Sequence, residues 1–120
     1  MPIHYTETPG TNIAEIRVSG FIDRAAYDDA VEKLTAFIED KGEIRLIEIV
    51  DSLGGFDPSV LWPGIRFDLK YIPRITHCAV VTDIGWMGPL SKAAGSVIST
   101  RLRTFDIAHL EDARRWIAEA

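Results

Sequence analysis

The sequence has few of the features that mark membrane-spanning, disulfide-stabilised or nucleic-acid-binding proteins. Cys78 is the one cysteine among 120 residues, so the chain cannot form an internal disulfide. No apolar run approaches the roughly 20 residues that a membrane-spanning helix needs. The first five residues lack the basic-then-apolar pattern of a signal peptide. With a net charge of −5, the chain is not expected to have the basic face that binds nucleic acid. We therefore expect a cytoplasmic protein with no nucleic-acid partner.

Sequence motifs for catalysis, cofactors and metals are absent as well. Ser52 does not belong to a G-x-S-x-G elbow, and Gly54-Gly55 fits neither a phosphate-binding Walker loop nor a dinucleotide fingerprint. No group of His, Cys, Asp and Glu has metal-ligand spacing. The sequence thus predicts a protein that is not an enzyme and that uses no cofactor or metal.

The three histidines and the cysteine fit structural roles. His4 falls in the first strand, His77 at the start of an interior strand and His109 at the cap of the last helix. None of them is therefore expected at the end of the sheet where Ser52 lies, and a hydrolase or transferase would need one there. Cys78 sits within an apolar strand, which is typical of a small core residue.

Hydrophobic periodicity predicts a single α/β domain. Alternation with period two indicates a hairpin, near-continuous apolar runs indicate interior parallel strands, and helical spacing indicates amphipathic helices. Asp23 and Gly42 are expected to cap one helix, and Pro63-Gly64 to interrupt another. The expected strands cover residues 3–7, 13–20, 44–50, 75–82 and 102–107, and the expected helices 23–41, 59–71, 90–99 and 110–119. The result is a mixed sheet of four to five strands with about four helices, in the order β-β-α-β-α-β-α-β-α.

A candidate site lies where two interior strands end. The loops after residues 50 and 82 leave successive parallel strands, so they are expected side by side at one end of the sheet. Both carry more apolar side chains than a solvated loop needs, which suits an apolar ligand or a membrane interface; folding back over the core is the alternative. The predicted lining is Phe56, Leu61, Trp62, Ile65, Trp86, Met87 and Leu90, with Arg66 or Lys92 near a polar head group.

Ser52 and Ser59 are candidate phosphorylation sites at the same end of the sheet. The unsatisfied N–H groups at the start of a helix stabilise an anion, so a phosphate near the helix expected after this loop would find favourable dipoles. The alternative is that Asp51 and Ser52 close a turn, as such residues commonly do.

The order of elements, together with Asp51-Ser52-Leu53-Gly54 after a central strand, resembles the STAS fold of anti-sigma-factor antagonists. Almost the whole chain more closely resembles the SpoIIAA-like family of small bacterial proteins, on the following stretches: Gly20-Phe21-Ile22, Leu61-Trp62, Ala79-Val80-Val81-Thr82-Asp83 with Trp86, and Phe105-Asp106 followed by Glu111-Asp112-Ala113-Arg114-Arg115-Trp116-Ile117.

This resemblance implies a STAS-like sheet without catalytic activity and a relation to CRAL-TRIO lipid-binding domains. In anti-sigma-factor antagonists a serine of an Asp-Ser-Ser-Gly motif is phosphorylated; here Leu53 replaces the second serine. The leading hypothesis is a non-enzymatic module for a small apolar or amphipathic ligand, with reversible peripheral membrane contact. The alternative is a STAS-type regulatory domain that binds a protein partner under control of Ser52 or Ser59. Exposed apolar positions leave homodimerisation open.

Overall fold

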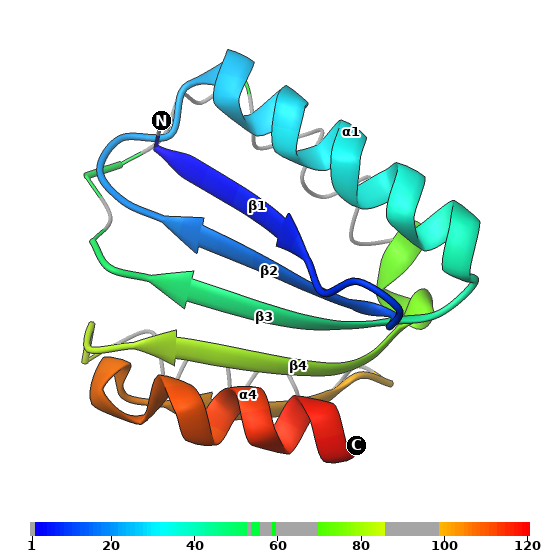
Figure 1. Ribbon diagram of the computed structural model, residues 1–120. Helices are drawn as coiled ribbons and strands as arrows, with labels where there is room; N and C mark the ends of the chain where they lie inside the picture. The colour runs from blue at the N-terminus through cyan, green and yellow to red at the C-terminus, as the bar shows by residue number, and fades with distance from the viewer. Residues whose placement is uncertain (1, 53, 56–58, 60–69, 86–98) are drawn as a thin grey trace.

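The five strands form one sheet whose order across the sheet follows the order in the chain (Figure 1). The computed structural model describes residues 2–52, 54–55, 59, 70–85 and 99–120. β1 and β2 are antiparallel, and each later strand is parallel to the one before it. The strands are β1 (Ile3–Glu7), β2 (Ile13–Val18), β3 (Ile44–Val50), β4 (Ile75–Thr82) and β5 (Arg101–Phe105).

Helix α1 (Arg24–Lys41) is bounded by the two caps that the sequence predicts. The Asp23 carboxylate accepts a hydrogen bond of 2.7 Å from the Ala26 N–H. At the other end Gly42 adopts a φ of 84° and donates its N–H to the Ile38 carbonyl at 2.8 Å. This left-handed conformation is one that glycine adopts without a steric penalty, so the helix stops there.

The sheet is covered by α1 on one face and by α4 (Leu110–Glu119) on the other. Side chains alternate across each strand, so each strand contributes to two cores. Leu34 and Ile38 of α1 pack in the first core, and Ala113 and Ile117 of α4 pack in the second. The strand residues in the first core include Ala14, Leu46, Cys78 and Val80; those in the second include Ile13, Ile47, Ile49, Ala79 and Val81.

The structure confirms the mixed sheet, with five strands. The described residues contain two α-helices instead of about four, and the helices expected over 59–71 and 90–99 fall almost wholly outside them. Two short 3-10 helices, η2 (Ile72–Arg74) and η3 (Ile107–His109), were not expected. β5 ends at Phe105 rather than residue 107, because the Ile107 N–H turns away to donate to Asp83 Oδ1 at 3.0 Å.

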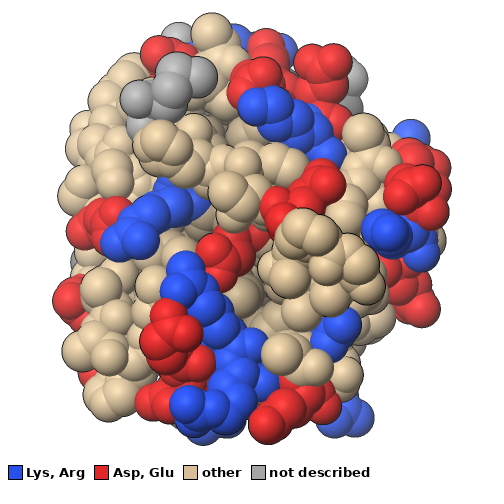
Figure 2. Space-filling view, viewed as in Figure 1, with Lys and Arg blue, Asp and Glu red and all other residues tan. Residues whose placement is uncertain are grey.

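Charged side chains of both signs alternate over the face seen in Figure 2. On the helices they form short-range pairs, among them Arg24 with Asp28 and Arg115 with Asp112. Exposed pairs of this kind contribute at most about 1 kcal/mol each. Stability therefore rests on the two cores. Neither helix within the described residues combines the length and apolarity that a bilayer crossing requires.

Replacing Ile117 by alanine should lower the free energy of unfolding by about 2–4 kcal/mol, because the side chain is fully buried in the second core. Ile107→Ala, at a partly buried position beside the same core, is the matched control and should cost about 1 kcal/mol. Urea denaturation followed by circular dichroism measures both. Equal losses would contradict this assignment of the core.

Candidate functional site at the carboxyl end of the sheet

The carboxyl ends of three parallel strands lie next to one another. Val18 of β2 pairs with Val50 of β3, and Val50 pairs with Thr82 of β4. The structure thus confirms that the loops after residues 50 and 82 leave adjacent strands at one edge, and it adds the loop after residue 18. We call this edge, made of residues 19–22, 51–52, 54–55 and 83–85, the rim.

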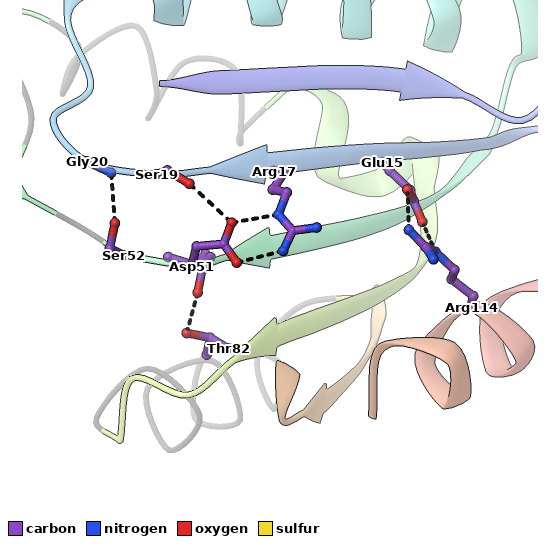
Figure 3. A network of polar contacts seen from close by, with 9 residues as sticks. Glu15, Arg17, Ser19, Gly20, Asp51, Ser52, Thr82 and Arg114 are labelled. Carbon is purple, nitrogen blue, oxygen red and sulfur yellow. Dashed lines mark hydrogen bonds and ion pairs between the residues drawn. The ribbon is translucent and has the colours of Figure 1, made fainter. Parts of the chain in front are cut away.

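Asp51 connects the first two of these loops (Figure 3). Its carboxylate accepts hydrogen bonds from Arg17 Nε at 2.6 Å, from Arg17 Nη2 at 2.8 Å and from Ser19 Oγ at 3.1 Å. The bidentate contact lowers the pKa of Asp51, with a smaller contribution from Ser19 in the same direction, and it raises the pKa of Arg17. Both groups are therefore charged at neutral pH, and the pair holds the start of one loop against the end of β2.

Backbone hydrogen bonds continue this connection beyond Asp51. The Gly20 N–H donates to Ser52 Oγ, and the Gly54 N–H donates to the Gly20 carbonyl, each at 3.0 Å. The Ile22 N–H in turn donates to the Gly55 carbonyl at 3.0 Å. A Cβ on Gly54 would lie 3.3 Å from the Gly20 carbonyl carbon, so a side chain there would force the two loops apart by a few tenths of an ångström. Ser52 thus links two loops that lie 32 residues apart in sequence, whereas the structural alternative predicted a local turn closed by Asp51 and Ser52.

Phe21 is the large hydrophobic side chain that this arrangement leaves exposed. It is 53% exposed, and it is the one large hydrophobic of the described residues classed as exposed. A Cβ on Gly55 would lie 3.7 Å from Phe21 Cδ2, so the ring stands beside the second loop. Sequence reasoning missed Phe21 as a site residue, although it lies in the stretch Gly20-Phe21-Ile22 that carries part of the family resemblance.

Thr82 and Asp83 fix the loop after β4. The Thr82 hydroxyl donates to the Val50 carbonyl at 2.9 Å and accepts from the Ile84 N–H at 3.1 Å. Asp83 accepts the Ile107 N–H, as described above. The polar side chains Asp51, Ser52, Thr82 and Asp83 are thus all engaged in hydrogen bonds that shape the rim.

A hollow of about 630 Å³ continues from this loop along the flank of α4. Its lining residues come from the end of β4, from β5, from η3 and from α4. They are Thr82, Asp83, Ile84, Gly85, Arg103, Thr104, Phe105, Asp106, His109, Asp112, Arg115, Trp116 and Glu119. His109 therefore lies at the same end of the sheet as Asp83, which corrects the expectation that no histidine does. Its Nδ1 is 3.8 Å from Asp106 Oδ2.

The predicted ligand-lining residues lie outside the described part of the structure. They are Phe56, Leu61, Trp62, Ile65, Arg66, Trp86, Met87, Leu90 and Lys92. Both predicted phosphorylation sites are described, and both are exposed. Ser52 Oγ accepts the Gly20 N–H, and the Ser59 carbonyl accepts Arg24 Nη1 at 2.8 Å.

The other candidate reactive groups occupy structural positions. His77, at the start of β4, packs edge-to-face on Trp116 with 5.7 Å between ring centroids. Burial lowers the pKa of His77, and Arg101 and Arg45 lower it further. Cys78 is buried in the first core, and burial raises its thiol pKa well above the usual value, so the thiol stays protonated. Among the described residues, no group of three or more His, Cys, Asp and Glu is arranged to hold a metal.

Comparisons with known proteins identify the fold. A protein-family model described as SpoIIAA-like matches residues 13–118. A crystal structure of an uncharacterised protein with a SpoIIAA-like fold from Shewanella loihica PV-4 is similar, with a TM-score of 0.71 and 15% sequence identity. The alignment covers 96% of this chain and 91% of that one. A search of curated proteins found no match.

We expect Asp51→Asn to lower the free energy of unfolding by about 1 kcal/mol, because a neutral amide loses the charge-assisted contacts to Arg17. Asp28→Asn breaks an exposed pair within α1, so it should cost less than about 0.5 kcal/mol. Chemical denaturation at neutral pH compares the two. A larger loss for Asp28→Asn would contradict the role given to Asp51.

The Arg17–Asp51 pair makes the free energy of unfolding depend on pH. Because the pKa of Asp51 is lower in the folded chain than in the unfolded chain, its contribution is complete above the unfolded value of about 3.9 and is lost as pH falls through the folded value. The stability difference between the wild type and Asp51→Asn should be constant from about pH 7 to pH 5 and shrink below about pH 4. A difference that grows on acidification would contradict the assigned direction of the pKa shift.

Proposed function

The chain belongs to the SpoIIAA-like family, and from this premise we propose that it is a non-enzymatic binding module for a small apolar or amphipathic, lipid-like ligand. The SpoIIAA-like fold supports a regulatory or interaction domain. The proposed binding surface is the rim, with reversible membrane contact through the same surface.

The exposure of Phe21 carries this proposal. Full burial of a phenylalanine side chain stabilises a protein by about 1.5–3 kcal/mol, and Phe21 leaves more than half of its surface in water. It stands beside Gly55, on a loop that the hydrogen bonds of Gly20 and Ile22 hold in place. An apolar side chain displayed on a fixed loop suits contact with an apolar partner.

The polar groups of the rim favour binding over catalysis. The Asp51 carboxylate is engaged by Arg17 and Ser19, and Ser52 Oγ accepts a backbone N–H. A serine nucleophile needs a base to take its proton, and Ser52 instead serves as an acceptor from Gly20. In this proposal the predicted apolar lining, from Phe56 to Leu90, provides the remaining contacts, and Arg66 or Lys92 meets a polar head group.

Phe21→Ala should reduce binding to phospholipid vesicles about tenfold, because it removes most of an apolar side chain from the contact. Phe21→Leu keeps an apolar side chain of similar size and should stay within about threefold of the wild type. Vesicle co-sedimentation measures both, and native mass spectrometry of gently purified protein tests for a retained lipid. Thermal unfolding controls for stability, which an exposed side chain should hardly change.

Absence of vesicle binding together with absence of a retained lipid would exclude this proposal. Equal vesicle binding by Phe21→Ala and the wild type would exclude Phe21 as a contact residue and leave the rim without its main support.

A STAS-type regulatory domain that binds a protein partner is the second candidate, and the environment of Ser52 favours it. Ser52 is exposed, and its Oγ holds the Gly20 N–H. A phosphate on this oxygen would alter the connection between the two loops and add negative charge beside Asp51. Phosphorylation would thereby change the surface that a partner meets.

Incubation with a cognate kinase followed by phosphopeptide mapping tests this candidate. We expect phosphate on Ser52, together with a large NMR shift of the Gly20 amide, because that amide donates to the modified oxygen. The Ser52→Ala variant should remove both signals, whereas Ser59→Ala should remove neither. If neither Ser52 nor Ser59 carries phosphate, this candidate is ruled out.

A further inference from the structure

We propose that the hollow between α4 and β5 binds a small zwitterion, a molecule that carries both a phosphate or carboxylate and an ammonium group. At about 630 Å³ the hollow lies within the range of about 300–1,000 Å³ typical of small-molecule sites. It has an aromatic wall, because Phe105 and Trp116 lie with their ring centroids 6.2 Å apart. Phe21 is not among its lining residues, so this inference does not rest on the function proposed above.

Several charges of the lining already have partners within the protein. Asp112 accepts a hydrogen bond of 3.0 Å from Arg115, and Asp106 lies 3.8 Å from the His109 ring. Asp83 accepts the Ile107 N–H through one of its two oxygens. These contacts offset part of the negative charge of the hollow. Arg103 and Glu119 are the charged lining residues for which no such contact is found among the described residues.

Arg103 is suited to bind an anion. Its guanidinium carbon lies 4.9 Å from the centroid of the Phe105 ring, a cation–π contact that restricts the planar group. Within the described part of the chain Arg103 forms no ion pair, so its N–H donors are available to a ligand. A guanidinium held against a ring presents its donors in the fork that matches a carboxylate or phosphate.

Glu119 provides the opposite charge in the same hollow. It is exposed, and it has no ion-pair partner among the residues that the structure describes. Its position three residues after Trp116 and four after Arg115 places all three on neighbouring faces of α4. An acid and a base that line one hollow, and that form no ion pair among the described residues, complement a ligand with one charge of each sign. A simple anion or a simple cation would satisfy only one of them.

The test uses O-phosphoethanolamine as the probe, with inorganic phosphate and ethanolamine as its two halves. Titrations followed by NMR of the Trp116 indole and the His109 ring report occupancy of the hollow. Phosphoethanolamine should bind at least about tenfold more tightly than either half, because it engages Arg103 and Glu119 together. No shift of either ring would overturn the proposal, as would equal affinities for the three probes.

Variants of two arginines on one strand provide the matched control. Arg101 and Arg103 lie two residues apart on the same face of β5, but Arg101 does not line the hollow. Arg103→Gln should weaken phosphoethanolamine binding about tenfold, and Arg101→Gln should leave it within about twofold. Glu119→Gln should weaken phosphoethanolamine binding but not phosphate binding. Equal effects at Arg101 and Arg103 would indicate general charge attraction and would overturn the site.

The source of the zwitterion is decided by repeating the titration with phosphatidylethanolamine vesicles. Binding of vesicles that Arg103→Gln abolishes identifies a lipid head group, whereas binding of free phosphoethanolamine alone identifies a soluble ligand. Failure of both overturns the proposal. Phe21→Ala separates this inference from the proposed function, because it should leave the affinity for free phosphoethanolamine unchanged even where vesicle binding is lost.

Discussion

The rim of the sheet depends on the contact of Asp51 with Arg17 and Ser19. A parallel pair of strands ends with its backbone groups open to water, and loops that leave it are free to diverge. Here the charged pair joins Arg17, near the end of β2, to Asp51, which begins the loop after β3. The two residues lie 34 positions apart in sequence. The hydrogen bonds of Gly20 with Ser52 and Gly54 join the same two loops at further points.

This constraint has a consequence for function. The side chains that fold the rim are the polar ones that an enzyme would use, so those groups are engaged in structure: Asp51 with an arginine, Ser52 with a backbone N–H and Thr82 with a carbonyl. The large hydrophobic side chain that the rim exposes within the described residues is Phe21. A surface of this kind is suited to recognition through shape and apolar contact.

The sequence predicted the sheet well because its strands carry local signals. Near-continuous apolar runs set β3 and β4 to the residue, and Asp23 and Gly42 set the ends of α1. Parallel topology then predicted where two loops would meet. The sequence could not predict the Arg17–Asp51 pair, since nothing local distinguishes an arginine on an exposed strand face from any other. Phe21 was missed for a related reason: one apolar residue before a helix cap is as typical of a buried contact as of an exposed one.

The position of α4 over the sheet accounts for the hollow. Arg114 reaches to Glu15 on β2, with 2.6 Å between Nε and Oε1 (Figure 3), and Arg45 on β3 donates to the Ile117 carbonyl at 2.7 Å. Both contacts tie α4 to strands other than β5, and Ala113 and Ile117 of α4 pack in the second core. These contacts hold α4 against β2 and β3, and within the described residues a hollow remains between α4 and β5. Trp116 lines this space together with Arg103 and Phe105. The contacts that position α4 thus involve β2 and β3, and the hollow lies between α4 and β5.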